Sequence, residues 1–215
     1  MKIKTAVGAA LLGLLMGVAA VGAAEPSDGV TTKEPKANHA KSYGKALPPI
    51  GFIGFCARNP EECKPTGGKP LKLAMSPERW NLVYQVNTYV NGKIAPVSDQ
   101  DLYGEPEYWA YPTDAGDCED YLLLKKRYLE GLGFPSSALL ITVVLDETNA
   151  GHAVLTITTN EGDFILDNRR NDIRRWNDVG YTYLKRQSPR DPRAWVALIK
   201  EKTIGSGFVA GMPER

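Results

Sequence analysis

A predicted β-hairpin formed by residues 152–158 and 163–167 constrains the fold more than any other feature of this 215-residue chain. Both segments are apolar and rich in β-branched residues, and the residues 159–162 between them, which end in glycine, are typical of a turn. A four-residue loop places Leu155 opposite Leu166 and makes one face of the hairpin wholly apolar, whereas a three-residue loop mixes the two faces. We therefore predict the four-residue loop.

The second face of this hairpin holds His152 and Asp167 side by side in the same register. An isolated histidine at a strand start is most often a surface residue or a hydrogen-bonded core residue. Here a carboxylate accompanies it, and such a pair is the arrangement that orients a histidine for acid–base chemistry. A continuous apolar run at residues 139–145 predicts a further, buried strand before the hairpin.

A single cysteine, Cys118, stands at the predicted start of a helix that runs to about Glu130. The free N–H groups of a first helical turn and the helix dipole favour a thiolate, which is the nucleophilic form of cysteine. The alternative is that Asp117 only caps the helix and that Cys118 fills a small space in the core. Taken together, Cys118, His152 and Asp167 supply the nucleophile, the general base and the orienting carboxylate of an activated thiol.

The other two cysteines, Cys56 and Cys63, lie close together in the sequence across a turn that contains proline. In an exported chain such a pair indicates a disulfide. Metal binding is the alternative, but neither a Cys-x-x-Cys motif nor a nearby histidine accompanies the pair. A disulfide leaves Cys118 free, and a free thiol in an oxidising compartment is a liability unless its reactivity is used.

The N-terminal residues 1–24 have the pattern of a secretory signal peptide: a basic start, an apolar run and small residues before a predicted cleavage after Ala24. A membrane anchor is the alternative, because the run is nearly long enough to span a bilayer; the small-residue exit favours cleavage, and we expect no stable membrane insertion afterwards. Residues 25–48 are polar and predict a disordered tether, residues 49–204 predict one domain, and residues 205–215 predict a flexible tail.

The charge balance argues against nucleic-acid binding. The chain has 26 basic and 25 acidic residues, and cleavage removes Lys2 and Lys4, so the mature protein is close to neutral. The basic stretch at residues 169–175 is interrupted by Asp172 and is interpreted as a solvated face.

The remaining elements are predicted from caps and periodicity. Residues 76–91 predict a helix with a serine cap, in which Asn87 interrupts an apolar stripe. Asn87 is either a structural hydrogen-bonding residue or a residue that lines the site, and we favour the structural role. Residues 99–112 predict an aromatic loop that either lines a substrate cleft or covers the core. Residues 181–186 predict a strand, and residues 191–199 predict a final short helix.

Three motifs carry a resemblance to a known family: GDCEDY at residues 116–121, GHAVL at 151–155 and GDFILDN at 162–168. Together they resemble the bacterial transglutaminase-like cysteine peptidases, the family of the LapG-type periplasmic proteases. The similarity extends from about Phe55 to Trp195, which is most of the mature chain.

The resemblance implies a papain-like α+β fold of the transglutaminase type, in which the helix that carries the cysteine packs on an antiparallel sheet that carries the histidine and the aspartate. It also implies a periplasmic cysteine endopeptidase with Cys118 as nucleophile, His152 as base and Asp167 as the residue that orients the base. Backbone N–H groups near the cysteine would hold the oxyanion.

The resemblance further implies a calcium requirement, with Asp117 and Glu119 as ligands. Carboxylate oxygens suit Ca²⁺, although acidic residues are also what any first helical turn favours. By the same resemblance the expected substrate is a protein, namely a large surface adhesin whose cleavage releases cells from a biofilm. The expected regulator is an inner-membrane receptor that senses cyclic-di-GMP.

Two other functions remain open. A transglutaminase or deamidase uses the same three residues but transfers the acyl group of a glutamine side chain. A non-catalytic periplasmic binding module is the second alternative, and the presence of all three residues argues against it.

Overall fold

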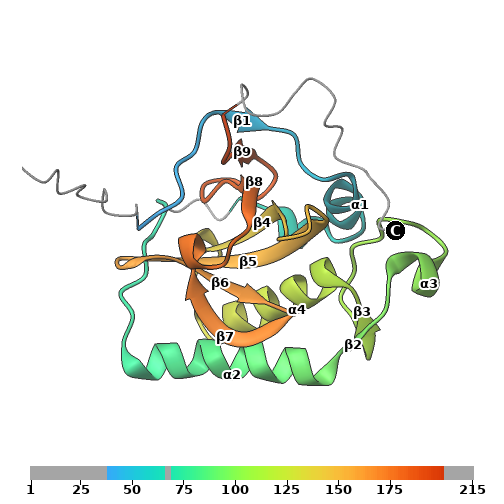
Figure 1. Cartoon of the computed structure of the whole chain (residues 1–215), viewed down its shortest axis with the longest axis horizontal. Coiled ribbons are helices and arrows are strands. Elements are labelled where there is room, and N and C mark those ends of the chain that lie inside the picture. The colour runs from blue at the N-terminus through green and yellow to red at the C-terminus, as the bar shows by residue number, and fades with distance from the viewer. Residues whose placement is uncertain (1–37, 66–68, 201–215) are drawn as a thin grey trace, which may run out of the picture. The chain divides into compact units, whose positions relative to one another are not determined.

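A computed structural model describes residues 38–65 and 69–200, and a seven-stranded antiparallel sheet is its central element (Figure 1). The order across the sheet is β1-β9-β8-β4-β5-β6-β7. The strands are β1 (Lys45–Ala46), β4 (Leu139–Leu145), β5 (Gly151–Thr159), β6 (Gly162–Asp167), β7 (Arg170–Arg175), β8 (Thr182–Gln187) and β9 (Trp195–Ala197). A separate short parallel pair joins β2 (Ala95–Pro96) to β3 (Ala115–Gly116).

The predicted hairpin register is confirmed, because Leu155 pairs with Leu166. The unpaired loop is shorter than expected, since Thr159 also pairs with Gly162. Gly162 has a φ of +144°, and a Cβ there would lie 2.6 Å from the carbonyl oxygen of Asn38. Glycine therefore fits this position for two reasons, its backbone angle and the close approach of another segment.

Four α-helices accompany the sheet: α1 (Ile50–Arg58), α2 (Pro77–Lys93), α3 (Asp99–Tyr103) and α4 (Cys118–Gly131). Helix α4 packs on β5, and α2 packs on α4 and β7, so that α4 lies between α2 and the sheet (Figure 1). Short 3₁₀ turns span Pro60–Cys63, Ser136–Ala138 and Trp176–Asp178. The predicted arrangement of a cysteine-bearing helix packed on an antiparallel sheet is confirmed.

Both faces of the sheet are buried, whereas the sequence indicated one wholly apolar face. On the face of α4, Leu155 and Leu166 join Leu122 of the helix in the main core. On the other face, Val154 and Ile165 belong to a second apolar cluster. His152 and Asp167 are therefore enclosed rather than exposed, with 4 % and 1 % of their surfaces accessible.

Asn87 of α2 is a structural hydrogen-bonding residue, as predicted. It is fully buried, and its side-chain amide donates to the backbone carbonyls of Arg170 and Asn171, both at 3.1 Å. Asn91 donates in the same way to the carbonyls of Asp167 and Arg170, both at 2.9 Å. These amides fasten α2 to the turn between β6 and β7.

The predicted helix at residues 191–199 is wrong. Asp191 caps a single turn, in which its side chain accepts the N–H of Arg193 at 2.9 Å. Strand β9 follows, with Trp195 paired to Gln187 of β8. The exposed edge of β8 offers ladder hydrogen bonds that outweigh the local preference for a helix.

The predicted tether ends earlier than residue 48. The His39 ring bonds the carbonyl of Thr159 at 2.9 Å, and the N–H of Ala40 donates to Asp163 at 3.0 Å. Residues 45 and 46 then form β1, which pairs with β9. Residues 38–48 therefore pack on the sheet through polar backbone and side-chain groups, and Ala40 and Ala46 are also partly buried against the two apolar clusters. The signal peptide, most of the tether and the tail lie outside the described residues.

The disulfide between Cys56 and Cys63 is confirmed, and Cys118 is free. In the aromatic segment, α3 replaces the start of the predicted loop, and Trp109 lies in the core while Tyr103 is partly exposed. Within residues 38–65 and 69–200, no helix has the length and apolar character needed to cross a membrane.

Candidate active site

Cys118 is the first residue of α4, as predicted, and it faces the strand that carries His152. The packing of α4 on β5 sets the backbone N–H of Ala153, the residue after His152, against the Cys118 sulfur. The thiol also donates to Glu119 Oε2 at 3.0 Å. The candidate nucleophile and the candidate base thus come from two elements that pack directly on each other.

The electrostatic surroundings of Cys118 differ from the expectation. Burial raises the pKa of the thiol, and the negative charges of Glu119 and Asp117 raise it further, whereas the N–H of Ala153 opposes them. The first-turn N–H groups were expected to favour the thiolate, but desolvation and two adjacent carboxylates outweigh them. The thiolate therefore needs positive charge nearby, from a protonated histidine or from a cation.

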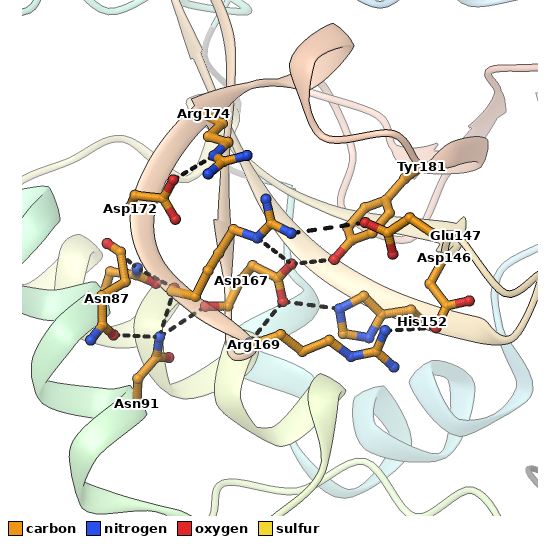
Figure 2. Close-up of polar contacts among 12 residues, drawn as sticks. Asn87, Asn91, Asp146, Glu147, His152, Asp167, Arg169, Asp172, Arg174 and Tyr181 are labelled. Atoms are coloured by element: carbon orange, nitrogen blue, oxygen red, sulfur yellow. Dashed lines mark hydrogen bonds and ion pairs between the residues drawn. The ribbon is translucent and has the colours of Figure 1, made fainter.

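His152 and Asp167 meet as the hairpin register predicted. His152 Nε2 lies 3.0 Å from Asp167 Oδ1 (Figure 2), and because the carboxylate can only accept, Nε2 carries the proton. The other ring nitrogen, Nδ1, is left as the atom that can accept a proton.

Three further groups stabilise the Asp167 carboxylate. Tyr181 Oη donates to Oδ2 at 2.6 Å, the backbone N–H of Arg169 donates to Oδ1 at 3.0 Å, and the Arg170 guanidinium lies 3.9 Å from Oδ2. Burial alone would raise the pKa of Asp167, but the hydrogen bonds from His152, Tyr181 and Arg169 outweigh it and lower the pKa. Asp167 is therefore ionised when buried, as an orienting carboxylate must be.

An ion pair connects this aspartate strand to the turn that precedes His152. Asp146, at the end of β4, accepts the N–H groups of Thr148 and Ala150 with one carboxylate oxygen, at 2.8 and 2.9 Å. Its other oxygen accepts Arg169 Nη1 at 2.6 Å (Figure 2). This ion pair holds the turn from β4 to β5, which precedes His152, against the turn from β6 to β7, which follows Asp167.

A cluster of carboxylates lies beside Cys118 and includes both predicted metal ligands. Asp117 and Glu119 are joined by Asp99, and one oxygen from each lies within 4.8 Å of the other two. Sequence reasoning missed Asp99, because the parallel pairing of β2 with β3 brings it to Asp117 from a distant position in the chain. The backbone N–H of Asp99 donates to Asp117 Oδ2 at 3.2 Å.

A fourth acid, Asp120, lies in the same region. Its Oδ1 accepts the N–H of Ala110 at 2.8 Å, while its Oδ2 and the Oδ1 of Asp99 have no hydrogen-bond partner among the described residues. Gly116 makes room for it, since a Cβ there would lie 2.6 Å from Asp120 Oδ2. Burial raises the pKa of Asp120 to about 8 and also raises that of Glu119, to which Asp117 adds repulsion.

This donor set fits a hard divalent cation. Buried carboxylates that repel one another, with oxygens that lack hydrogen-bond donors, are stabilised by an oxygen-seeking ion such as Ca²⁺. This carboxylate cluster lies directly beside the Cys118 thiol, and its negative charge opposes ionisation of that thiol.

Comparison with known proteins identifies the family. A family model described as bacterial transglutaminase-like cysteine proteinase matches residues 42–203. Among curated proteins, no match was found.

Three solved structures of Legionella pneumophila LapG are similar to the chain, each with a TM-score of 0.48. The calcium-bound structure has 24% sequence identity and covers 56% of this chain and 70% of that chain. A second LapG structure has 26% identity and covers 59% of this chain and 73% of that chain. An EGTA-treated structure has 25% identity and covers 59% of this chain and 74% of that chain.

Proposed function

Because the chain belongs to the bacterial transglutaminase-like cysteine proteinases and is therefore a cysteine peptidase, we propose that Cys118, His152 and Asp167 form its catalytic triad. The observation that carries this proposal is the buried hydrogen bond of 3.0 Å between His152 Nε2 of β5 and Asp167 Oδ1 of β6, because α4, which begins with Cys118, packs on β5.

In the proposed reaction, His152 Nδ1 accepts the thiol proton of Cys118, and the sulfur attacks the carbonyl carbon of the scissile peptide bond. The protonated His152 returns the proton to the leaving amine, and an acyl-enzyme thioester remains. Water, deprotonated by His152, then attacks the thioester and frees the acid and the thiol. Asp167 holds the ring and stabilises its positive charge throughout. Backbone N–H groups at the start of α4 would stabilise the oxyanion.

We further propose that Asp99, Asp117 and Glu119 bind Ca²⁺, with Asp120 adjacent to the ion. The ion would supply positive charge that offsets the carboxylates next to the thiol. A Glu119 carboxylate engaged as a ligand would no longer accept the Cys118 thiol hydrogen, which would leave the thiol free to donate to His152. Titration calorimetry with CaCl₂ tests the site without any substrate: heat of binding is expected for the native protein and a large loss of affinity for Asp99→Asn. Equal binding by both proteins contradicts this ligand set.

The proposed compartment is the periplasm, and the proposed substrate is an exported surface adhesin whose cleavage releases cells from a biofilm. The N-terminal sequence pattern and the Cys56–Cys63 disulfide support export, because disulfides persist in oxidising compartments. An inner-membrane receptor that senses cyclic-di-GMP is the proposed regulator. The substrate and the regulator rest on the resemblance of the three sequence motifs.

The decisive experiment mixes the mature protein with adhesin fragments from its own cell, with calcium or with a chelator, and measures intact masses. New chain ends that require Cys118 and disappear with chelator support the calcium-dependent peptidase. Deamidation or crosslinking without chain cleavage supports acyl transfer to other acceptors instead. Cys118→Ala is the matched control, because it removes only the sulfur. Helix α4 begins at this residue, and alanine leaves the backbone of the helix start in place.

A further inference from the structure

Tyr181 contacts both the carboxylate and the imidazole of the proposed triad, although its sequence position predicted only a core strand. The side chain is 9% exposed and lies immediately before β8. Its hydroxyl donates to Asp167 Oδ2 at 2.6 Å, and its ring meets the His152 ring edge to face, with 5.7 Å between centroids and 82° between planes (Figure 2).

The hydroxyl of Tyr181 donates to the one carboxylate oxygen of Asp167, Oδ2, that no other hydrogen-bond donor reaches within residues 38–65 and 69–200. Asp167 Oδ1 already accepts from His152 and from the N–H of Arg169, both at 3.0 Å. Near Oδ2, the Arg170 guanidinium stands at 3.9 Å, which is too long for a hydrogen bond. Without the hydroxyl, Oδ2 of the buried carboxylate lacks a donor, and rotation toward Arg170 supplies one. The same rotation moves Oδ1 away from His152.

We propose that Tyr181 is a positioning residue of the peptidase reaction: its hydroxyl fixes the rotation of Asp167, its ring fixes the plane of His152, and together they aim His152 Nδ1 at Cys118. This inference rests on the proposed triad and adds a fourth side chain to it. Tyr181 touches neither the substrate nor the reacting sulfur in this role.

Tyr183, which lies within β8, provides a matched control. It is buried to a similar degree, 8% exposed, and stands two residues after Tyr181. Within the part of the chain that the structure describes, its hydroxyl has no hydrogen-bond partner. Tyr181→Phe and Tyr183→Phe therefore each delete one buried hydroxyl, but only the first deletes a bond to Asp167.

The test uses iodoacetamide on the mature protein in buffer with calcium, so that no natural substrate is required. The Cys118 sulfur attacks the methylene carbon, a carbon–sulfur bond forms, and iodide leaves; intact mass follows the single alkylation. At neutral pH the rate depends on proton transfer to His152. At alkaline pH the solvent removes the proton, and the rates of all variants converge.

We expect Tyr181→Phe to alkylate about tenfold more slowly at neutral pH, the effect of one lost hydrogen bond to a charged group, and Tyr183→Phe to alkylate at the native rate. In an Asp167→Ala background, which has no side-chain acceptor, Tyr181→Phe should have no further effect, because the bond is already lost. Thermal unfolding of each variant separates this kinetic effect from a loss of stability.

The outcomes distinguish the inference from the proposed function. If His152→Ala alkylates at the native rate at neutral pH, the triad is wrong and the role of Tyr181 falls with it. If His152→Ala is slow but Tyr181→Phe reacts at the native rate, only the positioning role is overturned. Equal slowing by Tyr183→Phe, or a rate difference that is the same at every pH, also overturns it.

Discussion

Replacing Lys125 by methionine should stabilise the protein, although it removes a charge from the helix that carries Cys118. Lys125 lies on α4 and is 1% exposed. Among residues 38–65 and 69–200 its ammonium has no hydrogen bond or ion pair, and it lies over the Tyr121 ring only at 6.0 Å from the ring centroid. Burial lowers its pKa from 10.5 to about 7, and the attraction of Asp167 only partly opposes this shift.

The sign and size of the effect follow from that pKa. The folded-state pKa lies below the unfolded value, so folding loses stability as pH falls from 10.5 to about 7, and the penalty is complete below 7. Such a shift corresponds to a cost on the order of 4–5 kcal/mol at most. Methionine has a similar length and no charge, so Lys125→Met should recover at least about 2 kcal/mol of unfolding free energy at pH 7.

Urea unfolding from pH 7 to pH 10 is the assay, and Lys126→Met is the control. Lys126 is also buried, but its ammonium bonds Ser136 Oγ at 2.7 Å, the Leu139 carbonyl at 2.9 Å and Glu130 at 2.9 Å. Its removal leaves these buried partners without their ammonium donor and should destabilise the fold. The advantage of Lys125→Met should shrink toward pH 10. A variant that is less stable than the native protein at pH 7, or an advantage that does not change with pH, refutes the reasoning.

Two further predictions concern stability. Replacing Cys56 and Cys63 together by serine should lower the unfolding free energy by about 2–3 kcal/mol, the entropy of a short closed loop, and reducing agent should have the same effect on the native protein only. Asn87→Ala should cost about 2–3 kcal/mol because it leaves the carbonyls of Arg170 and Asn171 without their amide donor; faster amide exchange in β7 but not in β4 would locate the loss.

The elements that sequence predicted well are those whose information is local. Strand β4 begins and ends where the apolar run does, and α2 begins after its serine cap, since Ser76 accepts the N–H of Arg79. The His152–Asp167 pair was predictable because a short turn fixes the register of a hairpin, and register decides which side chains share a face.

Contacts between distant segments could not be predicted in this way. Asp99 joins Asp117 only because β2 pairs with β3, and each of those strands has two residues, too few for a periodic pattern. The helix predicted in place of β9 was wrong for the same reason. Trp195 and its neighbours pair with β8, and their own sequence contains no pattern that indicates this partner. The raised pKa of Cys118 likewise depends on burial, which a helix-start pattern does not reveal.

The position of Tyr181 depends on an irregularity that sequence patterns do not show. The pairing of β4 with β8 shifts by one residue between Val143 and Val144, so that Val144 pairs with Tyr183 on one side and with His152 on the other. With an unshifted ladder Val144 would pair with a different residue, and Tyr183, together with Tyr181 two residues before it, would point to the opposite face of the sheet. The bulge therefore does for Tyr181 what the hairpin turn does for Asp167: it decides which side chains share the face of His152. A residue placed by a turn can be predicted from its neighbours, whereas a residue placed by a bulge becomes visible only in the folded sheet.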